Sequence, residues 1–447
     1  MISLQGGYLA TVDEQDNEYP DSRLVIDGNR IAAVGAGAAA REYREAVPVD
    51  VRGRLVTPGL VNAHHHLYQW ITRGYAPDAT LFGWLSTLYP IWSRLTPELL
   101  LSSAAANLAW LALTGCTTST DHHYVFPGDS AALLAVEIEA ARKIGLRFHP
   151  CRGSMNLGAS AGGLPPDSVV EGHDAVLSAT AAAIDRWHDP GFDSMLRVAV
   201  APCSPFSVTA ELMRDCAELA RLKGVRLHTH LAETLDEDRF CRQTYQRSPV
   251  EYADDLGWLG PDVWLAHCVH LSPAAITRLA TSGTSVAHCP TSNGRLGAGI
   301  APVPALHAAG VPVGLGVDGA ASNESGRMSG ELHQAMLTAR SAHGPQALGA
   351  RQALRMATIG GARCLGRQDE LGSLQAGKLA DLAVWKLTGL AASGIADPVT
   401  ALVFGTPELD RLYVNGRLVV ADGVLQTADQ DELAADALRA SIAIVGR

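Results

Sequence analysis

Residues that could bind a metal ion recur along the chain, each directly after a short apolar run. One such run ends in His64 and continues through His66. These two side chains point the same way, because side chains on a strand alternate between its faces. Later runs lead to His230 and to Asp318. Three neutral imidazoles and a carboxylate suit a borderline ion such as Zn²⁺, and Fe²⁺ accepts the same donors. We therefore expect His64, His66, His230 and Asp318 to hold a metal ion.

The elements that must position these residues alternate regularly. Eight short apolar runs read as strands, and helical segments separate most of them. This order predicts the α/β class and a (β/α)₈ TIM barrel, in which the carboxyl ends of the strands meet at one end and carry the chemistry. The expected strands are 60–64, 117–120, 146–149, 196–200, 226–230, 263–267, 284–288 and 311–315.

Both ends of the chain contain hairpin signals. Residues 24–34 read as two strands around an Asp-Gly turn, and residues 411–420 as two strands around an Asn-Gly turn. A lone hairpin is only marginally stable in water. We therefore expect residues 1–56 and 372–447 to form one small composite β-sandwich beside a barrel domain of residues 57–371, the alternative being two separate flanking pieces.

The composition narrows the classes of partner and compartment. The 447 residues are 47% hydrophobic and carry a net charge of −11 without a basic cluster, so no nucleic-acid partner is expected. An apolar run of about 18 residues is missing, and the first residues do not resemble a signal peptide, so no membrane association is expected. The eight cysteines lack CxxC spacing, which favours a reducing, cytoplasmic setting.

Four stretches of the sequence together resemble one known family. Thr-Pro-Gly-Leu-Val-Asn-Ala-His-His-His at 57–66 resembles the first-strand signature of the amidohydrolase superfamily. His-Leu-Ala-Glu at 230–233, Ala-His-Cys at 266–268 and Gly-Val-Asp-Gly-Ala-Ala-Ser-Asn at 316–323 resemble later signatures of its cytosine-deaminase-like and chlorohydrolase-like branch. The resemblance covers essentially the whole chain and implies a metal-dependent hydrolase, commonly a homo-oligomer.

The resemblance also bears on the number of metal ions. Binuclear members of the superfamily bridge two ions with a carboxylated lysine that ends the fourth barrel strand, whereas this chain has Ala-Pro-Cys at 201–203. We therefore expect one Zn²⁺ per chain, and a ligand role for Cys203 is the alternative. The four lysines lie elsewhere, at Lys143, Lys223, Lys378 and Lys386.

Three residues of these signatures suit proton transfer in a hydrolytic deamination. Zn²⁺ lowers the pKa of a bound water molecule from 15.7 to about 7, which makes hydroxide available at neutral pH. We expect Asp318 to accept the water proton, His267 to orient the hydroxide and Glu233 to protonate the ring nitrogen beside the attacked carbon. Such proton transfer typically contributes about 10²–10⁴-fold. The alternative for Glu233 is a structural carboxylate that holds a metal-binding histidine in place.

The expected substrate is a small, flat, amino-substituted heterocycle. Residues 152–158 with 162–167, and residues 81–85 followed by 88–90, resemble those of 8-oxoguanine deaminases, which implies the hydrolysis of 8-oxoguanine to urate and ammonia. Related enzymes remove N-alkylamines from hydroxylated s-triazines, and isocytosine is a plausible smaller substrate. Amide-bond hydrolysis at the same site and a metal-free binding protein are more distant alternatives.

Four residues are candidate contacts to this substrate. Residues 68–92 are rich in aromatics and could cover the mouth of the barrel, where Gln69 and Trp84 could reach a heterocycle. His123 and Arg152 follow the second and third expected strands, which makes them plausible contacts as well.

Overall fold

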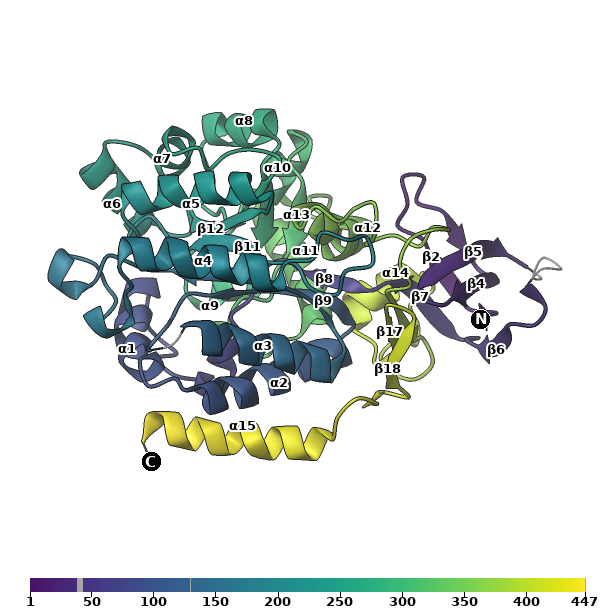
Figure 1. Ribbon diagram of the computed structural model, residues 1–447. Coiled ribbons are helices and arrows are strands. Elements are labelled where there is room, and N and C mark those ends of the chain that lie inside the picture. The colour runs from purple at the N-terminus through teal and green to yellow at the C-terminus, as the bar shows by residue number, and fades with distance from the viewer. Residues whose placement is uncertain (38–42, 129, 447) are drawn as a thin grey trace.

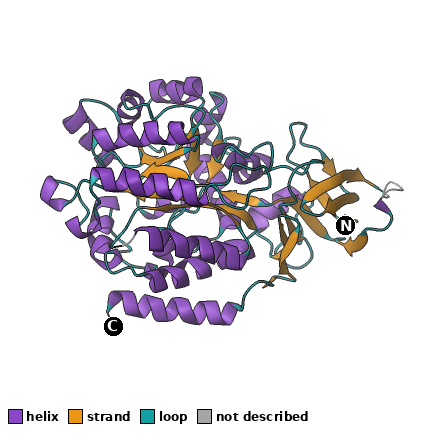
Figure 2. Cartoon of the chain, in the orientation of Figure 1, coloured by secondary structure: helices purple, strands orange, loops and turns teal. Residues whose placement is uncertain are grey.

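The computed structural model describes residues 1–37, 43–128 and 130–446, and its centre is a closed barrel of eight parallel strands. The barrel confirms the (β/α)₈ architecture predicted from the sequence. Figure 2 shows the strands in the middle of the molecule with helices around them. In chain order the strands are β8 (Leu60–Asn62), β9 (Cys116–His123), β10 (Arg147–Ser154), β11 (Ala199–Pro202), β12 (Leu227–Leu231), β13 (Val263–His267), β14 (Ser285–His288) and β15 (Val313–Leu315), and β15 pairs with β8 to close the ring.

The helices cover the outside of the barrel (Figure 1). Several begin where the sequence places a capping side chain: Thr96 accepts from the Leu99 amide and Ser272 from the Ala275 amide, which satisfies otherwise orphaned N–H groups. The helices are α2 (Pro97–Leu113), α3 (Ser130–Ile144), α4 (His173–Trp187), α5 (Ala210–Lys223), α6 (Leu235–Tyr245), α7 (Pro249–Asp255), α8 (Pro273–Ser282), α9 (Pro290–Arg295), α10 (Val303–Ala308), α11 (Met328–His343), α12 (Ala350–Arg355) and α13 (Gly361–Cys364).

Two sheets beside the barrel are built from the chain ends. One has the order β5-β4-β1-β6 and the other β19-β18-β17-β16-β7-β2-β3, so strands from both ends pair directly, as β7 does with β16. The sheets share an apolar core that includes Leu24, Val56 and Val384. Their strands are β1 (Ile2–Gln5), β2 (Tyr8–Ala10), β3 (Glu18–Tyr19), β4 (Ser22–Asp27), β5 (Arg30–Ala36), β6 (Val47–Asp50), β7 (Arg54–Pro58), β16 (Leu382–Lys386), β17 (Leu409–Val414), β18 (Arg417–Ala421) and β19 (Val424–Leu425).

Both predicted hairpins are present, and one turn is displaced by one residue. Asn415 and Gly416 connect β17 to β18, as predicted. In the first hairpin Asp27 pairs with Arg30, so the loop residues are Gly28 and Asn29 rather than Asp27 and Gly28. Gly28 has a φ of +57°, a left-handed conformation that glycine adopts without steric cost.

The C-terminal helix leaves the sheets and returns to the barrel. In Figure 1, α15 (Gln430–Val445) lies along α2, and the two helices are in contact. The end of the predicted segment 372–447 therefore packs on the barrel, and the boundaries at 56 and 371 stay predictions. Among the described residues, none of the helices combines the length and apolarity needed to cross a membrane.

The aromatic segment after β8 forms the 3-10 helix η2 (Leu67–Thr72) and the helix α1 (Leu81–Trp92). Most of its rings are buried against one another: the Trp92 ring lies 5.1 Å from the ring of Tyr68 and 5.2 Å from the ring of Trp84. These contacts hold the segment in place where it borders the pocket described below.

Candidate functional site

The four predicted metal ligands come together at the carboxyl end of the barrel. His64 and His66 follow β8, His230 lies in β12 and Asp318 follows β15. Nε2 of His66 lies 3.1 Å from Nε2 of His230 and 3.3 Å from Oδ1 of Asp318. Nε2 of His64 lies 3.4 Å from the same carboxylate oxygen. All four side chains are buried, so three imidazoles and one carboxylate converge away from water.

Hydrogen bonds on the far side of the rings determine which nitrogen lacks a proton. Nδ1 of His66 lies 2.7 Å from the carbonyl oxygen of His122, and Nδ1 of His230 lies 2.7 Å from that of Cys203. A carbonyl oxygen only accepts, so each Nδ1 donates and each Nε2 of the neutral ring bears a free lone pair. Burial lowers the pKa of His230 well below its ordinary value, which keeps the ring neutral. Two lone pairs 3.1 Å apart repel one another, and a metal cation held by both nitrogens would remove the repulsion.

His228 likewise fixes the proton of His64 on Nδ1 and leaves its Nε2 unprotonated. Nδ1 of His228 donates to the carbonyl oxygen of Trp264 at 2.8 Å, so Nε2 of His228 accepts from Nδ1 of His64, also at 2.8 Å. Nε2 of His64 is thus bare, and it is buried without a hydrogen-bond partner among the described residues. His228 was not predicted. The available signal was its position two residues before His230, which places both side chains on one face of β12.

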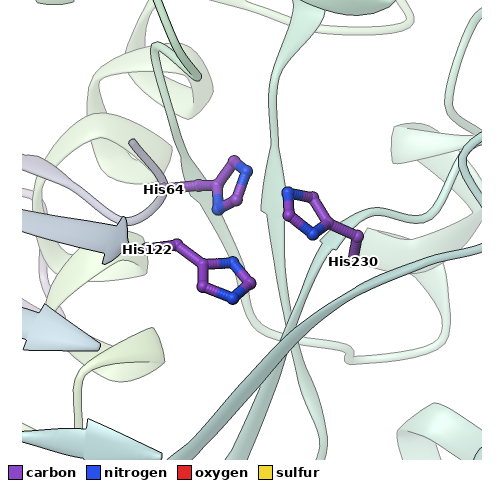
Figure 3. A group of neighbouring side chains, drawn as sticks. All are labelled: His64, His122 and His230. Atoms are coloured by element: carbon purple, nitrogen blue, oxygen red, sulfur yellow. The ribbon is translucent and has the colours of Figure 1, made fainter. Parts of the chain in front are cut away.

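His122 is a further imidazole beside the cluster that was not predicted. Its Nε2 donates to the carbonyl oxygen of Ala201 at 2.7 Å, which leaves Nδ1 bare and buried. Figure 3 shows the rings of His64, His122 and His230 turned toward one another, and one ring nitrogen of each lies within 4.8 Å of the other two. Adjacent histidines on a strand point to opposite sides, and the sequence does not tell which of His122 and His123 faces inward.

Asp318 is held toward the imidazoles by several donors. The Ser292 hydroxyl donates to Oδ2 at 2.6 Å and the Gly319 amide donates to Oδ1 at 2.7 Å. Nδ1 of His65 donates to the Asp318 carbonyl oxygen at 2.5 Å. Asp318 has a φ of +61°, an unusual conformation for a residue with a side chain. Surrounding hydrogen bonds must stabilise such strain, which is typical of functional sites.

Glu233 and His267 lie beside the cluster. Nε2 of His267 lies 3.7 Å from Oε2 of Glu233 and 3.9 Å from Oδ2 of Asp318, and Nδ1 of His267 hydrogen-bonds with Oδ1 of Asn293 at 3.0 Å. Burial and then the charge of Asp318 raise the pKa of Glu233 well above its ordinary value. A carboxyl group in this environment can keep a proton at neutral pH and donate it.

A pocket borders the imidazole cluster, Glu233 and His267, and two of the predicted substrate contacts line it. Both amide atoms of Gln69 are buried without a partner among the described residues. The Trp84 indole donates to the Ala321 carbonyl oxygen at 3.2 Å and presents its ring to the pocket. Gln69 therefore offers one free donor and one free acceptor there. Apolar side chains complete much of the wall: Leu81, Leu85, Tyr89, Phe206 and Leu296.

The other two predicted substrate contacts, His123 and Arg152, lie outside the pocket lining. Nδ1 of His123 lies 2.8 Å from the Glu137 carboxylate on α3, and Arg152 forms two bonds of 2.6 and 2.8 Å with Glu171. The Arg152 guanidinium also lies 4.2 Å from the centre of the Phe126 ring. Neither side chain is among the described residues that line the pocket. Both lie within their strands rather than after them, since β9 extends to His123 and β10 extends past Arg152 to Ser154. Acidic side chains from other segments bind both of them outside the pocket lining.

Cys203 lines the pocket, and burial raises the pKa of its thiol to about 12. Its Sγ lies 4.0 Å from Nδ1 of His230, the ring nitrogen that faces away from the cluster.

An eight-stranded barrel with a buried imidazole and carboxylate cluster at its carboxyl end is the architecture of a metal-dependent hydrolase. A model described as "Amidohydrolase family" matches residues 55–419. The chain therefore belongs to the amidohydrolase family, which confirms the resemblance found in the sequence, and it is a metal-dependent aminohydrolase of the chlorohydrolase and deaminase branch.

The similar proteins include enzymes named as a deaminase, an aminohydrolase and a chlorohydrolase. The chain is 45% identical to the 8-oxoguanine deaminase of Pseudomonas aeruginosa over 94% of both chains. It is 37% identical to the hydroxydechloroatrazine ethylaminohydrolase of Pseudomonas sp. (strain ADP), over 90% of this chain and 85% of that protein. The crystal structure of the atrazine chlorohydrolase TrzN from Arthrobacter aurescens TC1 complexed with zinc superposes with a TM-score of 0.94 at 35% identity, over 99% of this chain and all of that one.

Proposed function

We propose that this chain hydrolyses 8-oxoguanine to urate and ammonia at a single zinc ion. The observation that carries the proposal is one pocket that joins the bare imidazole cluster, the Glu233–His267 pair and the free amide of Gln69. An oxopurine has a flat ring, a ring nitrogen to protonate and an edge with both donors and acceptors. The relative named 8-oxoguanine deaminase, 45% identical, supports the same choice.

The chain's residues supply the proton transfers. A bound zinc ion would lower the pKa of a water molecule to about 7 and so provide a nucleophile at neutral pH. Asp318 takes one water proton as the water oxygen bonds to the amino-bearing carbon, and Glu233 protonates the adjacent ring nitrogen. Asp318 then passes its proton to the amine, the C–N bond breaks and ammonia leaves. The proton of the new hydroxyl returns to Glu233, which leaves a carbonyl and a protonated ring nitrogen. His267, beside both carboxylates, steadies the negative charge on the attacking oxygen.

The zinc ion and its number are part of the proposal. Three bare imidazole nitrogens and one carboxylate oxygen match the donors that zinc prefers, and the relative with the printed zinc complex has the same fold. The end of β11 carries Pro202 and Cys203 rather than a lysine that could bridge two ions. The homo-oligomer and the cytoplasmic compartment stay predictions.

A hydroxylated s-triazine with an N-alkylamino group is the second candidate. The apolar wall of Leu81, Leu85, Phe206 and Leu296 could accommodate an alkyl group. The 37% identical ethylaminohydrolase supports this reading.

A substrate panel separates the candidates. Zinc-loaded protein is incubated with 8-oxoguanine, guanine, isocytosine, an N-alkylamino hydroxytriazine and a cyclic amide, and the released ammonia or amine is measured together with metal content. The proposal predicts the highest kcat/KM on 8-oxoguanine and a zinc content near one per chain. A higher value on the triazine would replace it with the second candidate. Removal of the metal by a chelator is expected to abolish turnover, and zinc to restore it.

A further inference from the structure

We propose that Glu237 is a positioning residue: its carboxylate fixes the turn that carries Glu233 and thereby sets the placement of Glu233 against His267. This inference rests on the proposed function, because it assigns Glu233 the role of proton donor. Glu237 lies in the first turn of α6 and is completely buried.

The carboxylate of Glu237 accepts two consecutive backbone amides of the turn after β12. Oε1 accepts from the Ala232 amide at 2.8 Å and Oε2 accepts from the Glu233 amide at 2.8 Å. Ala232 has a φ of +54°, a left-handed conformation that costs free energy for a residue with a side chain. Both oxygens are thus engaged in holding a strained turn, and that turn begins directly after β12 and leads into Glu233.

An ordinary helix cap does not explain this geometry. Thr234 and Glu237 have the Thr-x-x-Glu spacing of a capping box, in which the glutamate accepts from the amide of the capping residue itself. Ser248 and Glu251 form such a box at the start of α7, where the Glu251 carboxylate accepts from the Ser248 amide at 3.0 Å and its hydroxyl at 2.7 Å. Glu237 instead reaches past Thr234 to the two residues before it.

The same turn is bonded to the turn that carries His267. The carbonyl oxygen of Ala232 accepts from the amides of Val269 and His270, each at 2.9 Å, and the Cys268 amide donates to the Leu231 carbonyl oxygen at 3.1 Å. His267 itself has a φ of +70°. Glu237, the Ala232 turn and the His267 turn therefore form one hydrogen-bonded unit, across which Glu233 and His267 lie 3.7 Å apart.

Replacement of Glu237 by glutamine separates positioning from capping. A capping box accepts glutamine as well as glutamate, so a capping role predicts that Glu237→Gln is tolerated. The two amides at Glu237 need two acceptors, and a glutamine side chain offers one acceptor and turns its NH₂ group toward the other donor. The variant should lose the turn although its volume is unchanged.

The experiment compares Glu237→Gln with the matched control Glu251→Gln. For Glu237→Gln we expect kcat on 8-oxoguanine to fall about 10–100-fold, as expected from one buried amide left without an acceptor, with KM and zinc content unchanged. Glu251→Gln should leave all three unchanged. In a Glu233→Gln background Glu237→Gln should have no further effect on kcat, because the two act through one proton transfer. Glu237→Asp keeps two acceptor oxygens on a side chain that is shorter by one methylene group. Its kcat should lie between those of wild type and Glu237→Gln, and it replaces Glu237→Gln in the experiment if that variant fails to fold.

Amide hydrogen exchange tests, without any substrate, whether Glu237 holds the turn that carries Glu233. Exchange in residues 231–234 should accelerate in Glu237→Gln and stay unchanged in Glu251→Gln. If exchange accelerates while no compound in the panel is turned over, the proposed function is wrong, but Glu237 does hold the turn. Wild-type kcat in Glu237→Gln, unchanged exchange, or additive losses in the double variant would each overturn the positioning role.

Discussion

Each predicted metal-binding imidazole in this protein depends on a hydrogen-bond acceptor at its Nδ1, because this acceptor leaves Nε2 free to bind the metal. His64, His66 and His230 each donate from Nδ1, to another imidazole or to a backbone carbonyl. Each therefore turns a bare Nε2, which can donate its lone pair to a metal ion, toward the cluster. Such partners orient the ligands, fix the ring tautomer and raise the basicity of the nitrogen that binds the metal.

His228 is the partner whose removal tests this arrangement. In His228→Leu the Nδ1 proton of His64 loses its acceptor, so we expect metal affinity to weaken by about 10–100-fold, measured by competition with a chromogenic chelator. His228→Gln, whose amide oxygen can accept the same proton, should recover most of the affinity. His343→Leu, at an exposed position, is the control, and equal affinities in all four proteins would contradict the role of His228.

Glu233→Gln tests the proton donor. The amide keeps the shape of the side chain and removes the transferable proton, so kcat should fall by about 10²–10⁴-fold while metal content and unfolding temperature stay at wild-type values. Metal analysis and ammonia release measure the two quantities separately. A kcat close to that of wild type would show that Glu233 is not the proton donor and would favour a structural role, in which its carboxylate holds a metal-binding histidine in place.

At the scale of elements, the turns after the barrel strands carry the functional groups in strained conformations. Ala232, His267 and Asp318 all have φ values near +60°, and each lies at or just after the end of a different strand. Hydrogen bonds from the next element stabilise these turns, as α6 does through Glu237. The helices therefore both cover the barrel and fix the direction of the side chains at its mouth.

Helix α3 also places a titratable group inside the molecule, and this group gives a pH-dependent stability. Burial raises the pKa of Glu137 to about 8, against 4.5 for the free side chain. Between these two values the folded state binds more protons than the unfolded state, so stability falls as pH rises, by at most about 1.4 kcal/mol per pH unit for one proton. Glu137→Gln should remove this slope in denaturant unfolding between pH 5 and 8. Glu139→Gln, exposed on the same helix, should retain the slope. If the free energy of unfolding varies with pH in the same way in wild type and Glu137→Gln, Glu137 is not the group responsible.

At the scale of the whole molecule, a buried ion pair joins the barrel to the sheet of the C-terminal strands. Arg147, at the start of β10, forms two bonds of 3.0 Å with the Asp381 carboxylate, which also accepts from the Asn415 amide at 2.7 Å. Arg147 is at the end of its strand opposite the metal cluster. The pair therefore bears on the stability of the assembly and not on the chemistry.

Removing one partner of this pair should be costly. Arg147→Met leaves Asp381 buried and unpaired, which we expect to destabilise the fold by about 3–5 kcal/mol in denaturant unfolding, with kcat per folded chain unchanged. Arg147→Met with Asp381→Asn should recover most of that loss, because the amide oxygen can still accept from Asn415. Equal free energies of unfolding in the single and double variants would show that the unpaired charge of Asp381 does not cause the loss of stability.

The sequence by itself determined the barrel and the convergence of His64, His66, His230 and Asp318. Strand periodicity and βα alternation are local properties of the chain, and parallel strands in a barrel bring their carboxyl ends together whatever the details of packing. A residue at the carboxyl end of such a strand therefore lies at the same end of the barrel as the others, and its side chain joins them when it points inward.

Only the tertiary structure decided which neighbours these residues meet. His123 and Arg152 lie among the last residues of β9 and β10, near the carboxyl end of the barrel, yet Glu137 and Glu171 from other segments bind them outside the pocket lining. His122 and His228 join the cluster with one ring proton each donated to a backbone carbonyl of another barrel strand, Ala201 in β11 and Trp264 in β13. A buried polar group must find a hydrogen-bond partner, and that partner comes from residues far along the chain, which strand periodicity does not specify.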